Sequence, residues 1–290
     1  MDEQELLKER FKSAVSSAVK AISENFDLEI KFGNNIASKK NSLNLPDVAQ
    51  LKKLQDFTNL RAFADSEALK IKYTDEKIYI KNQPEGSMAR ALYAIAEKIR
   101  YEKIGSDKLK GVKNNITECY QNKFKNKKNE EIMTEADVPI TEAFELYLRG
   151  HFFKIKQNEA TKKILSYWKN LFDKNLKKNL QELDNCIENQ NEFNQLIASL
   201  IDDLDFEDTK TRDKEEEENS KEDKSTSNKD EEDENSYQNE NEQSNDSNLN
   251  VLQTSLDSSN ENNKDNENET KEASTETQLP IDQKKTKAKK

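Results

Sequence analysis

Residues 88–105 read Met-Ala-Arg-Ala-Leu-Tyr-Ala-Ile-Ala-Glu-Lys-Ile-Arg-Tyr-Glu-Lys-Ile-Gly, and their spacing predicts a long helix at the centre of the chain. The apolar residues recur every three or four positions and so share one helical face: Met88, Leu92, Ile95, Ala96 and Ile99. A face of this kind packs against a core. The helix is expected to end at Gly105, which suits a C-cap, and a second helix is expected after Gly111.

The opposite side of this helix is crowded with charge at Glu97, Lys98, Arg100, Glu102 and Lys103. Glu97 and Arg100 are three positions apart, within side-chain reach on a helix. Paired carboxylates can perform acid–base chemistry, but on so charged a helix they are interpreted as solvated ion-pair partners. Glu97, Arg100 and Glu102 are kept as one candidate partner-docking face, an alternative to the lysines described below.

The expected fold class is mainly α, of the α+β type, with a small antiparallel β-sheet near the N-terminus. Residues 3–23 show the spacing of a first helix, and residues 27–32 alternate as a strand. Residues 68–73 and 77–81 also alternate on either side of Thr74-Asp75-Glu76, which predicts a β-hairpin that joins the strand in a sheet. Further helices are expected over 112–124, 140–148 and, in two or three segments, 158–206.

Charge divides the chain into two parts. Residues 207–290 hold 25 acidic and 13 basic residues, whereas residues 1–206 are nearly neutral with 33 acidic and 34 basic. The second part has too little apolar surface to offset the entropy of ordering it. The predicted organisation is a helical domain over 1–206 and a disordered acidic tail over 207–290.

The sequence offers no catalytic residue, no cofactor site and no metal site. His151 is the one histidine, without cysteine or carboxylate at a ligand spacing, and the five glycines form neither GxxxxGK[ST] nor GxGxxG. Cys119 and Cys186 are expected to be reduced thiols. Because no apolar run approaches the ~20 residues that span a bilayer, a soluble, cytoplasmic protein without membrane contact is expected.

Lysines are concentrated after the central helix, at Lys108, Lys110, Lys113, Lys123, Lys125, Lys127 and Lys128. A solvated surface is the favoured interpretation. Docking of an acidic protein, or of this chain's own tail, comes second, and nucleic-acid binding is the least favoured. Lys108, Lys110 and Lys113 are kept as candidate partner-docking residues.

The tail has one apolar interruption, at Leu249, Val251, Leu252 and Leu256. Its spacing allows one or two amphipathic turns on a partner, although chance clustering is the favoured interpretation. The last residues, from Lys284 to Lys290, form a basic cluster to which no role is assigned.

Two segments of the central region carry a more specific pattern, Glu97-Lys-Ile-Arg100-Tyr-Glu102-Lys-Ile-Gly105 and Gly111-Val112-Lys-Asn-Asn115. Both resemble the CobT subunit of aerobic, ATP-dependent cobaltochelatase. The likeness extends over most of residues 8–206, through Phe11-Lys-Ser-Ala-Val, Leu28-Glu-Ile-Lys-Phe-Gly33-Asn34, Tyr167-Trp168 and Phe193-Asn-Gln-Leu-Ile-Ala-Ser-Leu-Ile-Asp. An acidic, low-complexity linker after this domain is also a trait of the family.

The resemblance implies an accessory, non-catalytic subunit. CobT pairs with an AAA+ ATPase subunit, CobS, and this complex drives a large subunit, CobN, to insert cobalt into hydrogenobyrinic acid a,c-diamide. ATP, Mg²⁺ and Co²⁺ are accordingly expected on the partner subunits and not on this chain.

One departure from the family pattern concerns the end of the chain. The family continues past its linker into a von Willebrand A domain with a D-x-S-x-S motif, whereas Asp257-Ser-Ser-Asn-Glu261 has Glu at the place of the second Ser. The chain is therefore expected to be a fragment or a shortened form. The alternatives are an AAA+/von Willebrand remodelling complex unrelated to corrins, or an inactive truncated remnant.

Overall fold

The structure is a computed structural model that describes residues 3–33, 41–125, 132, 134 and 137–204. These residues form a mainly helical domain, as the sequence predicted. The expected acidic tail, residues 207–290, lies outside the described residues.

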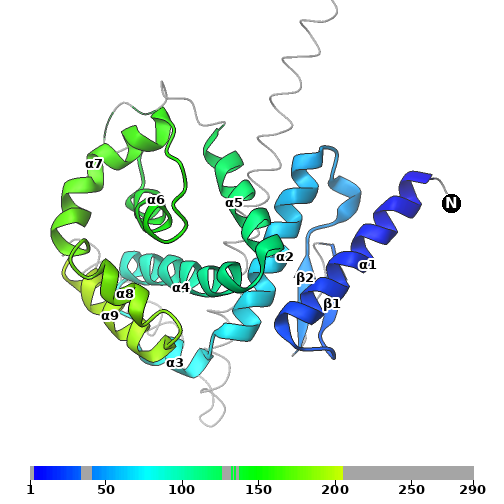
Figure 1. The fold of residues 1–290 in the computed structure, drawn as a ribbon, viewed down its shortest axis with the longest axis horizontal. Helices are drawn as coiled ribbons and strands as arrows, with labels where there is room; N and C mark the ends of the chain where they lie inside the picture. The colour runs from blue at the N-terminus through cyan, green and yellow to red at the C-terminus, as the bar shows by residue number, and fades with distance from the viewer. Residues whose placement is uncertain (1–2, 34–40, 126–131, 133, 135–136, 205–290) are drawn as a thin grey trace, which may run out of the picture.

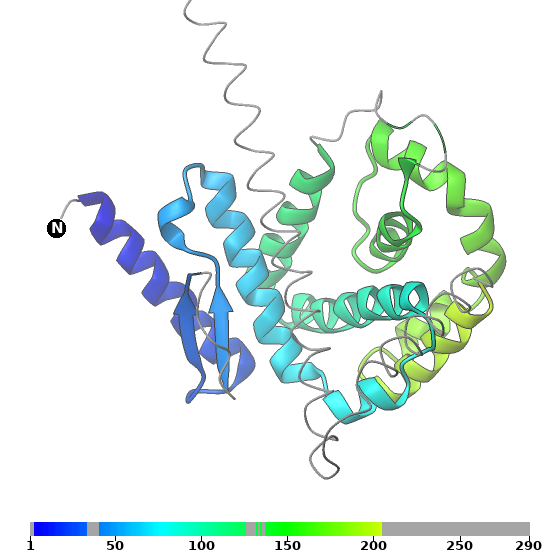
Figure 2. The same cartoon turned by 180° about the vertical axis from the view of Figure 1, so that it is seen from behind.

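The small sheet is parallel, so the predicted antiparallel sheet is wrong. Helix α1 (Glu3–Ser23) leads into strand β1 (Glu29–Phe32), which pairs with β2 (Ser42–Leu45) in the register Glu29↔Ser42 to Phe32↔Leu45. No strand was predicted at β2, although its Ser-Leu-Asn-Leu pattern alternates and buries both leucines. Figure 2 shows the two strands side by side near α1 and α2.

The predicted hairpin over residues 68–81 is wrong. After a 3₁₀ turn (Val48–Gln50), the chain forms α2 (Leu54–Tyr73) and then α3 (Glu76–Lys81). Thr74 and Asp75 separate the two helices, and Asp75 is the N-cap of α3, because its carboxylate accepts hydrogen bonds from the amides of Lys77 and Ile78. Much of α2 is buried around its circumference, which hides the amphipathic period that would have identified a helix.

Helix α4 (Ser87–Lys108) is the centre of the domain, as residues 88–105 predicted. It contacts α2, α5, α6 and α9, and Figure 1 shows it crossing the middle of the fold. The helix does not end at Gly105. It continues to Lys108, and Leu109 alone separates it from α5 (Lys110–Lys125). Gly105 is instead a buried helical position that packs against Leu69 of α2.

The remaining helices complete the described domain. They are α6 (Ile140–Phe152), α7 (Glu159–Asn175), α8 (Leu180–Asn185) and α9 (Gln190–Asp202). Asn158 and Asn189 start α7 and α9 by accepting amide hydrogen bonds with their side chains. The apolar stripes of these helices form core, with Ile164, Phe172, Phe193, Ile197 and Ile201 fully buried.

Among the helices of the described residues, none combines the length and apolar character needed to cross a membrane.

Candidate functional site: buried charges and an exposed lysine surface

The predicted docking face of α4 is buried, so the expectation that it is solvated is wrong. Glu97, Arg100 and Glu102 are 3%, 1% and 1% exposed. A partner protein cannot reach these side chains on the folded domain. Their charges are instead matched inside the protein, in two groups that lie along α4.

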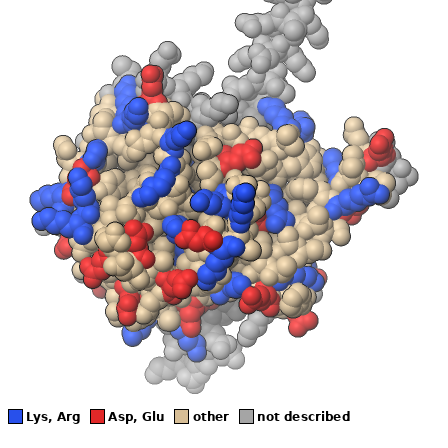
Figure 3. All heavy atoms as spheres, in the orientation of Figure 1, with Lys and Arg blue, Asp and Glu red and all other residues tan. Residues whose placement is uncertain are grey.

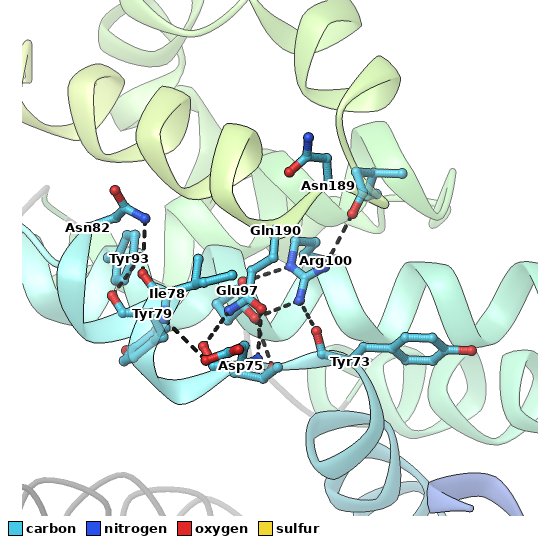
Figure 4. A network of polar contacts seen from close by, with 12 residues as sticks. Tyr73, Asp75, Ile78, Tyr79, Asn82, Tyr93, Glu97, Arg100, Asn189 and Gln190 are labelled. Carbon is cyan, nitrogen blue, oxygen red and sulfur yellow. Dashed lines mark hydrogen bonds and ion pairs between the residues drawn. The ribbon is translucent and has the colours of Figure 1, made fainter.

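Arg100 is the centre of the first group, shown in Figure 4. Its Nε and Nη2 atoms donate to the two carboxylate oxygens of Glu97, each at 2.8 Å. Nη2 also donates to the backbone carbonyl of Tyr73 at the end of α2, and Nη1 donates to that of Ile187 before α9 at 3.3 Å. Thr74 completes the group with a 2.8 Å hydrogen bond to Glu97. The planar guanidinium therefore joins three separate parts of the chain.

A second set of hydrogen bonds extends this group toward α3. Asp75 and Gln190 exchange two of them: the Asp75 amide donates to the Gln190 side chain at 2.7 Å, and that side chain donates to the Asp75 carbonyl at 3.1 Å. The Tyr93 hydroxyl donates to the carbonyl of Tyr79 at 2.9 Å. These contacts fasten α3 to α4 and α9 (Figure 4).

Arg149 of α6 is the centre of the second group. It pairs with Glu102 of α4 at 2.8 Å and with Glu145, one turn earlier on α6, at 3.0 Å. Ser66 of α2 donates to the other oxygen of Glu102 at 2.5 Å. The guanidinium carbon of Arg149 lies 3.3 Å from the centre of the Tyr120 ring of α5. This group therefore joins α2, α4, α5 and α6.

The pKa values of this second group show that its charges are compensated. Burial raises the pKa of Glu145, but the attraction of Lys123 and Arg149 outweighs it and holds that pKa well below the usual range. Burial lowers the pKa of Arg149, but the carboxylates of Glu102 and Glu145 act in the opposite direction, and the net effect is a pKa above the ordinary value. The side chains of Glu145 and Arg149 are therefore both ionised at neutral pH, as a structural ion pair requires.

Sequence reasoning missed Arg149 altogether. Its signal was an arginine in a largely apolar helix, four residues after Glu145, which is the spacing of a helical ion pair. The side chains of Glu102 and Tyr120 that complete its surroundings come from α4 and α5, so local spacing alone could not bring them together.

Lys108, Lys110 and Lys113 are exposed, as predicted, at the corner where α4 meets α5. Figure 3 shows Lys and Arg side chains across the middle of the visible face, in the region of α4 and α5, with Asp and Glu side chains among them. We call Lys72, Lys108, Lys110 and Lys113, with Tyr73 and Leu109, the lysine surface. The side chain of Lys125 lies outside the described residues, as do Lys127 and Lys128.

Within the described residues, no three His, Cys, Asp or Glu side chains are grouped so as to hold a metal ion. Cys119 and Cys186 are free thiols, and burial raises the pKa of Cys119 to about 11. A pocket of about 370 Å³ lies between α5, α6 and the start of α7, with Tyr120, Leu146 and Arg149 in its lining. Since Arg149 is already matched by two carboxylates, it supplies no uncompensated charge to this pocket.

The family model of the cobalamin biosynthesis protein CobT matches residues 6–279. The chain belongs to the CobT family. Its role therefore lies in cobalamin biosynthesis. The match covers the helical domain and most of the acidic part of the chain. No solved structure matches this CobT family member.

Proposed function

We propose that this CobT family member is an accessory subunit of an aerobic, ATP-dependent cobaltochelatase. It would dock an AAA+ ATPase subunit, which with a large chelatase subunit inserts Co²⁺ into hydrogenobyrinic acid a,c-diamide. ATP and Mg²⁺ would be held by the partner subunits. The family match favours this function over a remodelling role unrelated to corrins.

One observation carries the docking role: the domain separates its charges into two classes. The buried charges of α4 are matched internally, with Arg100 and Arg149 each held by carboxylates. In contrast, Lys110 and Lys113 form no ion pair or hydrogen bond through their side chains with the rest of the described chain. A helical domain with an exposed basic corner suits a subunit that positions an acidic partner, because complementary charge speeds and orients docking.

The experiment is co-expression of the full chain with the AAA+ subunit from the same organism. Size-exclusion chromatography with light scattering would then measure assembly with and without ATP and Mg²⁺. A stable, stoichiometric complex is expected. The triple variant Lys108→Glu, Lys110→Glu, Lys113→Glu should weaken that complex by at least tenfold, since reversing rim charges changes association directly.

The matched control is Lys162→Glu, Lys177→Glu, Lys178→Glu, which makes the same change in net charge at exposed positions on and just after α7. It should leave assembly unchanged. Equal loss of binding in both triple variants would show that net charge alone matters and would remove the lysine surface as the docking site. Absence of any complex at micromolar concentrations would overturn the proposed partnership.

A further inference from the structure

The lysine surface combines positive charge with exposed apolar groups. The ammonium groups of Lys72 and Lys108 lie over the ring of Tyr73, 5.3 and 5.2 Å from its centre. Leu109 is 41% exposed and stands between Lys108 and Lys110 in the chain. A ligand for this surface needs negative charge and a few apolar side chains on one short segment.

The acidic groups already beside this surface bind its lysines weakly. Lys72 pairs with Glu24 at 2.7 Å and Lys108 pairs with Glu188 at 3.2 Å, but Glu24 and Glu188 are 69% and 72% exposed in their side chains. Exposed pairs of this kind contribute little and exchange readily with other carboxylates. Asp107, the other nearby acid of α4, is already paired with Lys103.

One segment of the same chain has the required composition. Residues 230–263 contain ten acidic residues and no lysine or arginine. Most of the large apolar residues after position 206 also lie there, at Tyr237, Leu249, Val251, Leu252 and Leu256. The segment thus carries both the negative charge and the apolar groups that a ligand of the lysine surface needs.

The chain between the described domain and residues 230–263 is long enough for this segment to reach the lysine surface. Lys108 is paired with Glu188, which lies just before α9, and the 13 residues of α9 rise by about 20 Å. The chain therefore leaves the described domain near Leu204, within a few tens of ångströms of the lysine surface. The 26 positions from Leu204 to Asp230 can span up to about 90 Å when extended.

We propose that residues 230–263 bind the lysine surface of their own chain. Tethering makes this an intramolecular event with an effective concentration in the millimolar range, so that even a millimolar intrinsic affinity fills about half of the surface. If the AAA+ partner docks on the same lysines, as proposed above, the acidic segment competes with it. That second step rests on the proposed function, whereas the contact itself does not.

The test is carbodiimide cross-linking of the full chain without any partner, read by mass spectrometry. Carboxylates of residues 230–263 should join Lys72, Lys108, Lys110 and Lys113 several-fold more often than the control lysines Lys162, Lys177 and Lys178. The preference should fall at 1 M salt, where the screening length is about 3 Å. An even distribution over all exposed lysines would overturn the proposal.

Two further experiments test the charged and the apolar contacts separately, and distinguish contacts within one chain from contacts between two chains. Replacing Asp230→Asn, Glu231→Gln, Glu232→Gln, Asp233→Asn and Glu234→Gln should reduce the links that the remaining acids of the segment make, and so should Leu249→Ser with Leu252→Ser and Leu256→Ser. Mixing isotope-labelled and unlabelled chains gives the source of each link. Mixed links in place of links within one chain would overturn the intramolecular contact in favour of a second copy.

The competition step has its own readout. The chain with the five neutralised acids should bind the AAA+ subunit several-fold more tightly than the natural chain in the chromatography experiment. If the natural chain forms the expected cross-links but the variant binds the AAA+ subunit with unchanged affinity, the competition alone is overturned. If the natural chain forms the expected cross-links but neither chain binds the AAA+ subunit, the result counts against the proposed function and not against the internal contact.

Discussion

Gly105 of α4 lies so close to Leu69 of α2 that a β-carbon on the glycine would come within 2.2 Å of Leu69 Cδ2. Leu69 is fully buried, so it has little space to move. The two helices can approach this closely only because residue 105 has no side chain. The glycine that sequence reasoning assigned to a helix end is therefore a packing requirement between α2 and α4.

Replacing Gly105 by alanine should consequently destabilise the domain by about 1–3 kcal/mol, the usual cost of overpacking. Gly111→Ala is the matched control, since a β-carbon there meets nothing within 4 Å. Helix propensity predicts that this control is neutral or stabilising by up to about 1 kcal/mol. Urea unfolding followed by circular dichroism measures both. Equal stability of the two variants would contradict the close packing.

Adding Leu69→Ala to Gly105→Ala should recover part of the loss relative to the sum of the single changes, because the smaller side chain makes room for the new methyl group. Strict additivity of the two changes would show that they act at independent places.

The Glu97–Arg100 pair should behave as a unit. Glu97→Gln or Arg100→Met alone leaves a buried charge without its partner, which costs about 3–5 kcal/mol, whereas the double variant should lose much less than the sum. The exposed pair Lys103 and Asp107 on the same helix is the control. Lys103→Met and Asp107→Asn should each cost about 1 kcal/mol or less. A double-mutant cycle of unfolding free energies decides between coupling and additivity.

Acid should weaken the domain through Glu145. The folded pKa of this carboxyl lies below its ordinary value of 4.5. Its contribution to stability is therefore complete above that value and is lost as the pH falls from there toward the folded pKa. The difference in unfolding free energy between the natural chain and Glu145→Gln should be largest near pH 7 and shrink below about pH 4.5.

Urea titrations at several pH values measure this difference. Glu118→Gln, which removes an exposed carboxylate from α5, controls for the loss of one negative charge. A difference that stays constant down to pH 3 would contradict the strong pairing of Glu145 with Lys123 and Arg149.

The helices that could be predicted from sequence are those with one buried face. Helix α1 was predicted at its observed bounds, and α4 was identified as central, because their apolar residues repeat at helical intervals. Helix α2 was mistaken for half of a hairpin. Its residues are buried on several sides, and the alternation of Leu69, Ile71 and Tyr73 was read without the tertiary contacts that override it.

The candidate site was predicted in part. Lys108, Lys110 and Lys113 lie on the surface, as a run of lysines at a helix junction suggested. The charges of α4 were placed in solvent because charged residues are rarely buried without partners. The spacing of Glu97 and Arg100 did place that pair within reach. The other partners are distant in the chain: Arg100 bonds Tyr73 and Ile187, 27 and 87 positions away, and Glu102 pairs with Arg149, 47 positions away. No local pattern reveals such contacts.

The single residue between α4 and α5 determines how a force at this junction would be transmitted to the rest of the domain. With only Leu109 between two helices, no length of chain is available there to act as a hinge. A force applied where α4 meets α5 would act on the C-terminal end of α4, and α4 contacts α2, α5, α6 and α9. Such a force would therefore pass from the junction directly to the four helices that pack on α4.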